Sequence, residues 1–554
     1  MLDLIKGYLT TIKLISNDTL FIIIIVFRFK FKEKNMDKII ILDFGGQYCH
    51  LIARRVRDLG VYSEILPFDI SLHKMQEKNP KGIILSGGPN SVYEKGSPQL
   101  TEGFYEYIQQ EDIPLLGICY GLHLIIHQLN GIIEPHKKKE YGKTEIQILK
   151  PDGLFEGLEK REIVWMSHGD QVKEMPKNFK VLARTETCPI AAYGNDNKLL
   201  YGVQFHPEVV HTQKGDRILE NFIKNIANAK QEWKLKDWID KSVTSIQKQI
   251  GSNDQVILGL SGGVDSSVAA VLIHKAIGDR LHCIFVNNGV LRKNEVGEVQ
   301  KAFQEQLGFK NFHYVNAEDE FLNSLEGVKD PEEKRKIIGH KFIEIFENKT
   351  IELEKQYPRI KYLAQGTIYP DRVETAATSK SAAKIKSHHN LTLPEDMKLK
   401  IIEPLKDLYK DEVREIGLQL GLPDQIVYRH PFPGPGLAVR IVGAITKERL
   451  DILREADAIL IEQIKKEGIY KDIWQAFCVF LPLKTVGIMG DFRTYEYLCA
   501  IRIVESKDAM TANFAKLDWE FLERVSTKII NEVKNINRVV YDISNKPPAT
   551  IEFE

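Results

Sequence analysis

The stretch "VILGLSGGVDSSVAAVLIHKAIG", Val256 to Gly278, combines an apolar strand, a glycine-rich turn and an apolar helix. Nucleotide-binding proteins often hold phosphate at such a turn, because N–H groups at the helix N-terminus point at the anion. The turn has neither the lysine of a G-x-x-x-x-G-K-[ST] loop nor the pattern G-x-G-x-x-G. Its sequence, Ser261-Gly262-Gly263-Val264-Asp265-Ser266-Ser267, therefore indicates a different kind of phosphate chemistry.

The bulk composition is that of an ordinary globular protein with several domains. A chain of 554 residues is too long for one core, and its length is typical of roughly three or four domains. Lys plus Arg and Asp plus Glu each number 76, so net charge gives no indication of nucleic-acid or membrane binding. The six cysteines form no C-x-x-C pair, which favours a reducing, cytoplasmic location over a disulfide or zinc framework.

Residues 1–36 are interpreted as a separate N-terminal extension. The apolar run "LFIIIIVF", Leu20 to Phe27, is well short of the roughly 20 residues that a membrane span needs. Basic residues follow it and a small-residue cleavage site does not, so a signal peptide is a poor match. Membrane anchoring is the alternative. We expect instead that the extension is dispensable or that translation starts at Met36.

From Met36 onward, apolar strand-like runs alternate with helical patterns, which predicts α/β architecture with parallel sheets. A charged helical connector begins near Glu232, and the Pro/Gly-rich "HPFPGPG" follows Arg429. Three domains in series are predicted: two doubly wound α/β domains and a smaller α+β domain at the C-terminus.

A nucleophile is predicted in the first domain. In "IPLLGICYGLHLIIHQL", a strand runs into Gly117-Ile118-Cys119-Tyr120-Gly121 and a helix follows, which is the pattern of a nucleophile elbow. The helix N-terminus beneath Cys119 would favour its thiolate form. Far downstream, His206 and Glu208 end an apolar strand, and alternate residues of a strand point the same way. Glu208 can therefore orient His206 beside Cys119. A buried structural cysteine is the alternative when Cys119 is considered alone.

G-x-C-x-G followed by H-P-E resembles the class I glutamine amidotransferases, over roughly Lys38 to Ala229. The resemblance implies that Cys119 attacks the side-chain amide of glutamine, His206 shuttles the proton and Glu208 holds His206. It also implies an oxyanion hole from the backbone N–H groups of Gly88 and Tyr120. One departure is His123, which stands where the family usually has a glutamine that helps to hold the substrate.

The loop of the opening stretch resembles the S-G-G-x-D-S loop of the ATP pyrophosphatases. These enzymes cleave ATP between the α- and β-phosphates, so the loop would cradle pyrophosphate as the leaving group. We expect Asp265 to help hold Mg²⁺, a hard cation that prefers carboxylate and phosphate oxygens. The chemistry that follows is adenylation of an acceptor oxygen.

The acceptor is indicated by further motifs, including "FVNNGVLRKNE", "DPEEKRKIIG", "RHPFPGPGLAVR" and "NKPPATIEFE". Together they resemble the glutamine-hydrolysing GMP synthetases from Met36 to Glu554, which implies ATP, XMP and glutamine as substrates. The resemblance also implies domains at 37–233, 234–429 and 430–554, the last completing the XMP site and forming a homodimer. Nucleic-acid and membrane partners are not expected.

Individual roles in the second and third domains rest on this resemblance alone. It implies a lid over the nucleotide, and XMP-binding residues further along: Asp371, Glu374 and Lys386 for the lid, and Arg335, Gln475, Lys546 and Glu552 for XMP. Two departures are Asn287, where Asp is usual, and "NLTLPED", where the family has Gly-Gly.

Three other functions are alternatives for a chain with these motifs. A glutamine-dependent NAD synthetase shares the loop but uses an unrelated amidotransferase, so Cys119 and the H-P-E motif argue against it. A tRNA-thiolating enzyme would carry sulfur-handling cysteines and a basic face. A regulatory binding protein on an inactive scaffold would be expected to have lost Cys119, Asp265 or the lid charges, and all are present.

Overall fold

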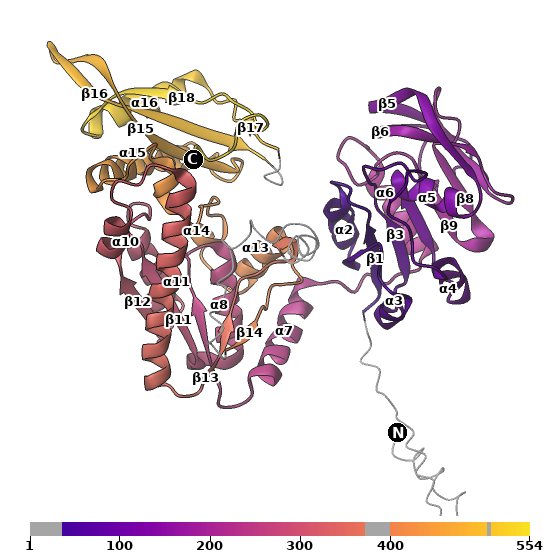
Figure 1. Cartoon of the computed structure of the whole chain (residues 1–554), viewed down its shortest axis with the longest axis horizontal. Coiled ribbons are helices and arrows are strands. Elements are labelled where there is room, and N and C mark those ends of the chain that lie inside the picture. Colours follow the sequence, from indigo (N-terminus) through magenta and orange to yellow (C-terminus); the bar gives the residue numbers. More distant parts are fainter. Residues whose placement is uncertain (1–35, 372–398, 507–510) are drawn as a thin grey trace, which may run out of the picture.

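The structure, a computed structural model, describes residues 36–371, 399–506 and 511–554 (Figure 1). Three sheets succeed one another along the chain. The first belongs to the indigo and violet part, and the second and third lie together in the magenta to yellow part (Figure 1). The apolar run at residues 20–27 lies outside the described residues. Among the described residues, no helix is long and apolar enough to cross a membrane.

The first sheet has a parallel half and an antiparallel half. Its order is β2-β1-β3-β4-β9-β8-β7-β5-β6, and the pairs from β2 to β9 are parallel while those from β9 to β6 are antiparallel. The parallel half matches the predicted doubly wound domain, whereas the antiparallel extension was not expected from the sequence. Its strands are β1 Lys38–Asp43, β2 Tyr62–Pro67, β3 Gly82–Leu85, β4 Leu115–Ile118, β5 Ile132–Ile148, β6 Arg161–Glu174, β7 Lys180–Arg184, β8 Ala192–Asn195 and β9 Leu200–Val203.

The parallel strands of this sheet are short and apolar because helices cover both faces. β3 and β4, GIIL and LLGI, are buried at every position, which is the pattern of strands without a solvent face. The covering helices are α2 Cys49–Asp58, α3 Leu72–Lys78, α4 Phe104–Gln110, α5 Tyr120–Gln128 and α6 Gly215–Glu220.

The second sheet is fully parallel and has the order β12-β11-β10-β13-β14. The chain leaves β10 toward β11 on one side and returns to β13 on the other, so β10 lies at the point where strand order reverses. Ligands of open α/β sheets bind at the carboxyl ends of strands at such a point. The strands are β10 Gln255–Gly259, β11 Leu281–Asn287, β12 Phe312–Asn316, β13 Ile360–Ala364 and β14 Lys400–Ile402.

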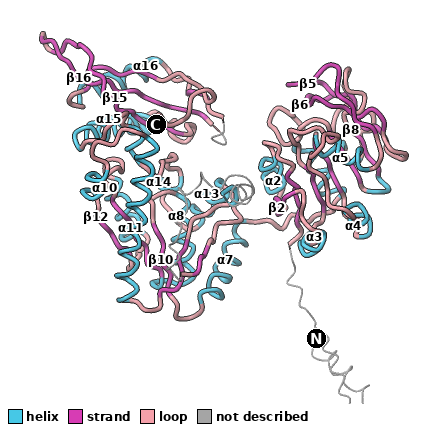
Figure 2. The backbone as a smooth tube through the Cα atoms, in the orientation of Figure 1, coloured by secondary structure: helices cyan, strands magenta, loops and turns pink. Residues whose placement is uncertain are grey.

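Helices flank this sheet as in a doubly wound domain (Figure 2). α8, which follows the phosphate-binding sequence, is buried along most of its length because its sequence is apolar on nearly every side. The helices are α7 Leu235–Ile250, α8 Val264–Ile277, α9 Glu295–Gln300, α10 Glu318–Ser324, α11 Pro331–Gln356, α13 Lys410–Gln419 and α14 Asp424–Val427.

The C-terminal part packs helices against one face of a small sheet, as an α+β domain does. Its elements are α15 Lys447–Lys466, β15 Gln475–Met489, β16 Phe492–Glu505, β17 Asn513–Phe514, α16 Trp519–Glu532 and β18 Ile536–Tyr541. β15 and β16 form a long hairpin that projects from the molecule (Figure 1). A single hydrophobic core joins the second sheet to α15, α16 and this hairpin, so the two parts share an interior.

A buried arginine joins the first part of the chain to the second. Arg57 of α2 donates to Glu412 of α13 across 2.8 Å, and its side chain is 2% exposed. Glu412 also accepts from the indole of Trp233 at 2.8 Å. The guanidinium carbon lies 4.9–5.2 Å from the ring centres of four aromatic residues: Tyr62, Trp233, Tyr369 and Tyr409. We call these six residues the Arg57 cluster.

Candidate active sites

The turn after β4 is a strained elbow that projects Cys119 from the sheet edge. Cys119 has φ of +52°, an uncommon backbone conformation for a residue with a side chain. The residues two positions before and after it must be glycine, because a Cβ on Gly117 would lie 2.5 Å from Gly121 and one on Gly121 would lie 2.5 Å from Leu85. Small residues therefore let strand and helix approach closely enough to form the elbow.

The carboxyl ends of the neighbouring strands β4 and β9 bring the predicted triad together. His206 Nδ1 lies 2.7 Å from Glu208 Oε1, and both side chains are almost fully buried. Burial opposes the charged imidazole, but Glu208 and a hydrogen bond with Cys119 outweigh it and raise the pKa of His206 well above its usual value. The arrangement can hold an imidazolium next to a sulfur nucleophile, which is the chemistry of cysteine acyl transfer.

Backbone and ring contacts fix His206 on its other sides. Its N–H donates to Trp165 O at 3.0 Å and its carbonyl accepts from the Thr212 hydroxyl at 2.6 Å. The ring of Tyr48 meets His206 edge-on at 5.1 Å. Arg55 of α2 donates to the carbonyl of Glu208 at 3.1 Å. The imidazole is therefore held in place before any substrate arrives.

Gly88 and Tyr120, the predicted oxyanion-hole residues, lie next to each other beside the elbow. Tyr120 is the first residue of α5, so its N–H lacks an acceptor within the helix. A Cβ on Gly88 would lie 3.2 Å from the Tyr120 ring, and one on the preceding Gly87 would lie 3.2 Å from His206. The loop after β3 thus packs against both the elbow and the triad.

The phosphate-binding sequence forms a loop between β10 and α8. The hydroxyls of Ser261 and Ser266 lie 3.0 Å apart, and the Ser261 N–H donates to Ser266 at 3.2 Å. Gly262 has φ of +73°, and its carbonyl accepts from Arg429 at 3.0 Å. The loop closes on itself through small hydroxyls and leaves the N-terminus of α8 accessible to an anion.

Asp265, in the first turn of α8, pairs with Lys410 at the start of α13. Lys410 contacts Oδ2, and among the described residues Asp265 Oδ1 is buried without a hydrogen-bond partner. The described residues contain no group of three or more His, Cys, Asp or Glu side chains that could hold a metal alone. A free carboxylate oxygen beside a phosphate-binding loop fits Mg²⁺ that takes its other ligands from the nucleotide and water.

Three family models match successive parts of the chain. They are glutamine amidotransferase class-I at residues 40–226, NAD synthase at residues 233–338 and GMP synthase C terminal domain at residues 462–553. A "GMP synthase [glutamine-hydrolyzing]" from Carboxydothermus hydrogenoformans is 55% identical over 93% of this chain and 99% of its own length. Proteins of the same name from Brachyspira hyodysenteriae and Aquifex aeolicus are both 53% identical, over 94% and 93% of this chain and 100% and 99% of their own. This chain belongs to the glutamine-hydrolysing GMP synthases.

Of the residues that the GMP synthase resemblance assigned to XMP, Gln475 and Glu552 are in direct contact. Gln475 donates to Glu552 at 2.6 Å, and the fully buried Arg440 donates to both oxygens of the same carboxylate at 2.9 and 3.0 Å. Arg335 of α11 reaches the same C-terminal segment through the carbonyl of Glu554. Lys546 pairs with Ala512 through its backbone.

Of the predicted lid residues, Glu374 and Lys386 lie outside the described residues, as does "NLTLPED". Asp371 is described, and its carboxylate accepts from the N–H of Ile368 at 3.2 Å. The lid therefore stays a prediction.

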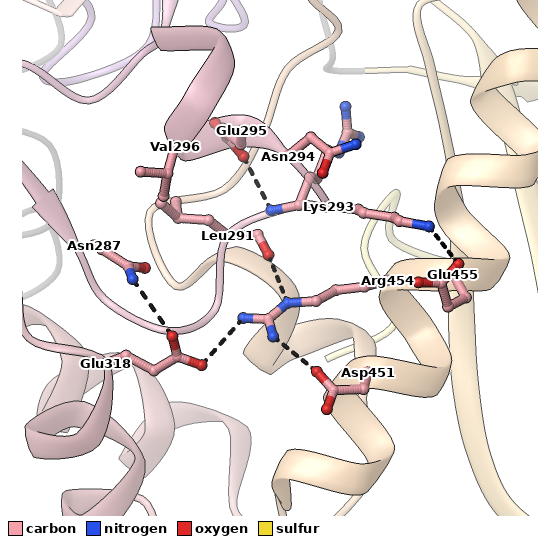
Figure 3. Close-up of a pocket in the computed structure, with 11 residues that line it drawn as sticks. Asn287, Leu291, Lys293, Asn294, Glu295, Val296, Glu318, Asp451, Arg454 and Glu455 are labelled. Atoms are coloured by element: carbon pink, nitrogen blue, oxygen red, sulfur yellow. Dashed lines mark hydrogen bonds and ion pairs between the residues drawn. The ribbon is translucent and has the colours of Figure 1, made fainter. Parts of the chain in front are cut away.

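The departure at Asn287 lies in a cavity of about 330 Å³ between the β11–α9 loop and α15 (Figure 3). Asn287 donates to Asn316 at 2.8 Å and more weakly to Glu318 at 3.4 Å. Arg454 crosses the cavity wall to Glu318, Asp451 and the carbonyl of Leu291 (Figure 3). An aspartate at 287 would set a second carboxylate beside Glu318, and asparagine donates a hydrogen bond instead.

Several site residues were missed from the sequence. Lys410, Arg440 and Gln204 contact Asp265, Glu552 and Cys119 respectively, yet none belongs to a motif with its own chemistry. Their partners are 145, 112 and 85 positions away, so only the fold brings the groups together. Arg440 ends the motif "RHPFPGPGLAVR", and this position was a signal that could have drawn attention to it.

Proposed function

We propose that this protein converts XMP to GMP with ATP as the activating nucleotide and glutamine as the nitrogen donor. The observation that carries the proposal is the combination, in one chain, of a buried Cys-His-Glu triad with a serine–glycine loop at the switch point of a second sheet. The first releases ammonia, and the second activates the oxygen that ammonia replaces.

In the first domain, residues 37–233, Cys119 would attack the side-chain carbonyl of glutamine. His206 protonates the departing ammonia, and Glu208 keeps the imidazole charged and oriented. The N–H groups of Gly88 and Tyr120 stabilise the oxygen that becomes negative in the tetrahedral intermediate. Water then releases glutamate from the thioester, with His206 as the base.

In the second domain, residues 234–429, the C2 oxygen of XMP would attack the α-phosphorus of ATP and release pyrophosphate. Residues 261–267 hold that leaving group with backbone N–H groups and serine hydroxyls at the start of α8. Ammonia then adds to C2, and AMP departs with the oxygen. A lid made by Asp371, Glu374 and Lys386 would keep water from the adenylate.

Asp265 is the residue that would hold Mg²⁺, through the carboxylate oxygen that Lys410 leaves free. Bound there, the ion would neutralise charge on the pyrophosphate group. Lys410 would then stay close to the same phosphates, and the pairing with Asp265 keeps its side chain directed at the loop.

The third domain, residues 430–554, would complete the XMP site and form a homodimer. Arg335 and Lys546 suit the phosphate, and Gln475 with Glu552 suits hydroxyl or ring donors. An apolar patch at the projecting hairpin supports self-association, because large exposed apolar patches mark interfaces. Its members are each more than half exposed: Leu483, Val486, Ile488, Phe492 and Tyr495. The proposed location is the cytoplasm.

One assay with purified protein tests the proposal. ATP, XMP and glutamine should yield AMP, pyrophosphate, GMP and glutamate in equal amounts, and ammonium salts should replace glutamine. Nicotinic acid adenine dinucleotide in place of XMP should give no product. Formation of NAD, or of no AMP with any acceptor, would overturn the proposal. Light scattering of Phe492→Asp against wild type tests the homodimer, and an unchanged mass would exclude this patch.

A further inference from the structure

A histidine that departs from the family pattern lies behind the nucleophile. His123 is one turn after Cys119 in α5 and is 4% exposed. Its Nε2 lies 2.7 Å from Oε1 of Gln204, which directly follows β9, lies two residues before His206 and is fully buried. The Gln204 amide nitrogen lies 3.9 Å from Sγ of Cys119. The three side chains form a chain from His123 through Gln204 to the sulfur.

The protonation state of His123 decides which groups donate and which accept in this series of side-chain contacts. Burial lowers the pKa of His123 to about 4, so the imidazole is neutral at pH 7 and carries one N–H. An N–H on Nε2 donates to the carbonyl oxygen of Gln204. Because an amide has its oxygen and nitrogen on opposite sides, the NH₂ group then faces Cys119. The reversed amide would place its NH₂ group against the Nε2–H, so two donors would face each other and no hydrogen bond would form between His123 and Gln204.

We infer that His123 is a positioning residue that fixes the Gln204 amide with its NH₂ group toward the sulfur of Cys119. Gln204 then supplies a hydrogen-bond donor to Sγ, which stabilises negative charge on the sulfur when Cys119 reacts as a nucleophile. The inference rests on the proposed function only in assigning glutamine as the substrate. The contact with the sulfur is long, so we expect a modest effect, roughly three- to tenfold in rate.

His123→Phe tests the inference because it keeps an aromatic ring of similar size and removes the N–H. We expect the variant to slow both glutamine hydrolysis (kcat) and alkylation of Cys119 by iodoacetamide at pH 7, each roughly three- to tenfold. The KM for glutamine should change less than twofold. Gln204→Leu should have the same effect, and the double variant should be no slower than Gln204→Leu alone, since the two residues act as one unit.

His123→Gln is the matched control, because it restores a donor at this position. It should recover at least half of the wild-type alkylation rate, which a role in packing alone does not predict. A raised KM with unchanged kcat and alkylation in His123→Phe would overturn the inference and place His123 on the substrate side. If His123→Phe does not fold, unchanged alkylation in Gln204→Leu overturns it equally.

A separate assay on the same proteins, GMP formation with ammonia as the nitrogen source, tests the proposed function independently of the inference about His123. Ammonia-dependent formation of GMP should be at wild-type level in all four variants, because the adenylating site is in another domain. Loss of that activity in the wild type itself would contradict the proposed function and leave the alkylation result unaffected.

Discussion

The two candidate active sites share one local architecture but differ in what the turn does: one turn carries a candidate nucleophile, and the other is a candidate phosphate-binding loop. In each, a buried parallel strand ends in a glycine turn and a helix begins: β4, Cys119 and α5 in one, β10, residues 261–263 and α8 in the other. The Cys119 turn is tight, and its nucleophile is 8% exposed. The serine–glycine loop is wider, and Ser261 at its start is exposed.

The difference lies in what each turn presents to a ligand. In the proposed function the protein itself supplies the reacting atom at Cys119, and the strained turn, the burial and the fixed imidazole are present before substrate binds. At the second site, in the same proposal, the protein supplies a phosphate-binding loop, and the reacting atoms all belong to ATP and XMP. The charged side chains around the serine–glycine loop form ion pairs with one another, Asp265 with Lys410 and Arg429 with Glu295.

The largest expected effect separates the two sites completely. Cys119→Ala should lower glutamine-dependent synthesis of GMP by about 10⁴-fold or more, since removing a nucleophile disables its whole triad. Synthesis from ammonium salts should continue. The measurement is GMP formation with each nitrogen source. Cys188→Ala, at another buried cysteine of the same domain, should keep both activities. Failure of Cys119→Ala with saturating ammonia would show that the sites are not independent.

Asp265→Asn should disable the other site and spare the first. It keeps the side-chain size but removes the charge that we assign to the metal, which costs a few kcal/mol of barrier, or about 10²- to 10³-fold in AMP formation. The N-cap of α8 is Gly263, so loss of a helix cap does not explain such a change. Asp424→Asn, at an exposed ion pair with Lys471, is the control. Near-normal AMP formation with normal Mg²⁺ dependence would contradict the metal role.

Glu208→Gln tests how much of the first site depends on a charge held in advance. The variant keeps a hydrogen-bonding oxygen near His206 but loses the carboxylate that raises the pKa of that imidazole. We expect glutamine hydrolysis to fall about 10- to 100-fold, because hydrogen bonds to charged groups contribute about 1.5–3 kcal/mol. The limb of the pH–rate profile due to His206 should move to lower pH. Glu220→Gln on the surface of α6 should change neither quantity by more than twofold.

The smallest expected effect concerns acid stability of the second sheet. Burial, together with the neighbouring His313, lowers the pKa of His282 in β11 to about 4. The unfolded chain has the higher pKa, so His282 contributes stability above pH 6.5 that is lost as pH falls toward 4. His282→Phe should lessen the loss of stability between pH 7 and pH 5 by about 1–2 kcal/mol. Urea unfolding followed by circular dichroism at both pH values measures it, and equal losses in both proteins would contradict it.

The sequence predicts short apolar strands and the turns and helices that follow them better than it predicts long, charged strands such as β5 and β6. The opening stretch appears in the structure as β10, the loop and α8, and the elbow at Cys119 follows directly from its flanking glycines. The parallel sheets followed from alternating strand and helix patterns. The long antiparallel strands β5 and β6 were missed, because their sequences alternate weakly and carry many charges.

The candidate sites divide in the same way. The contact of His206 with Glu208 was predicted, but the expected reason was wrong: both residues lie beyond β9, which ends at Val203, so a turn and not a strand directs them toward each other. The contact of Arg440 with Glu552 could not be predicted, since nothing in a sequence says which arginine is buried. The ion pair of Asp265 with Lys410 could not be predicted either, since the position of Lys410 depends on α13 packing beside α8.

The Arg57 cluster has a consequence for how the first and second domains separate. When the two domains are in contact, the Arg57 guanidinium is paired with Glu412 and lies against four aromatic rings. When the domains are fully separated, water would hydrate both charges. A small gap between the domains would break the Arg57–Glu412 ion pair without admitting water to hydrate the two charges. An unpaired buried charge is strongly unfavourable. Intermediate positions are therefore the least stable ones. The junction therefore favours two states, fully joined or fully separated domains, and disfavours small displacements of one domain against the other.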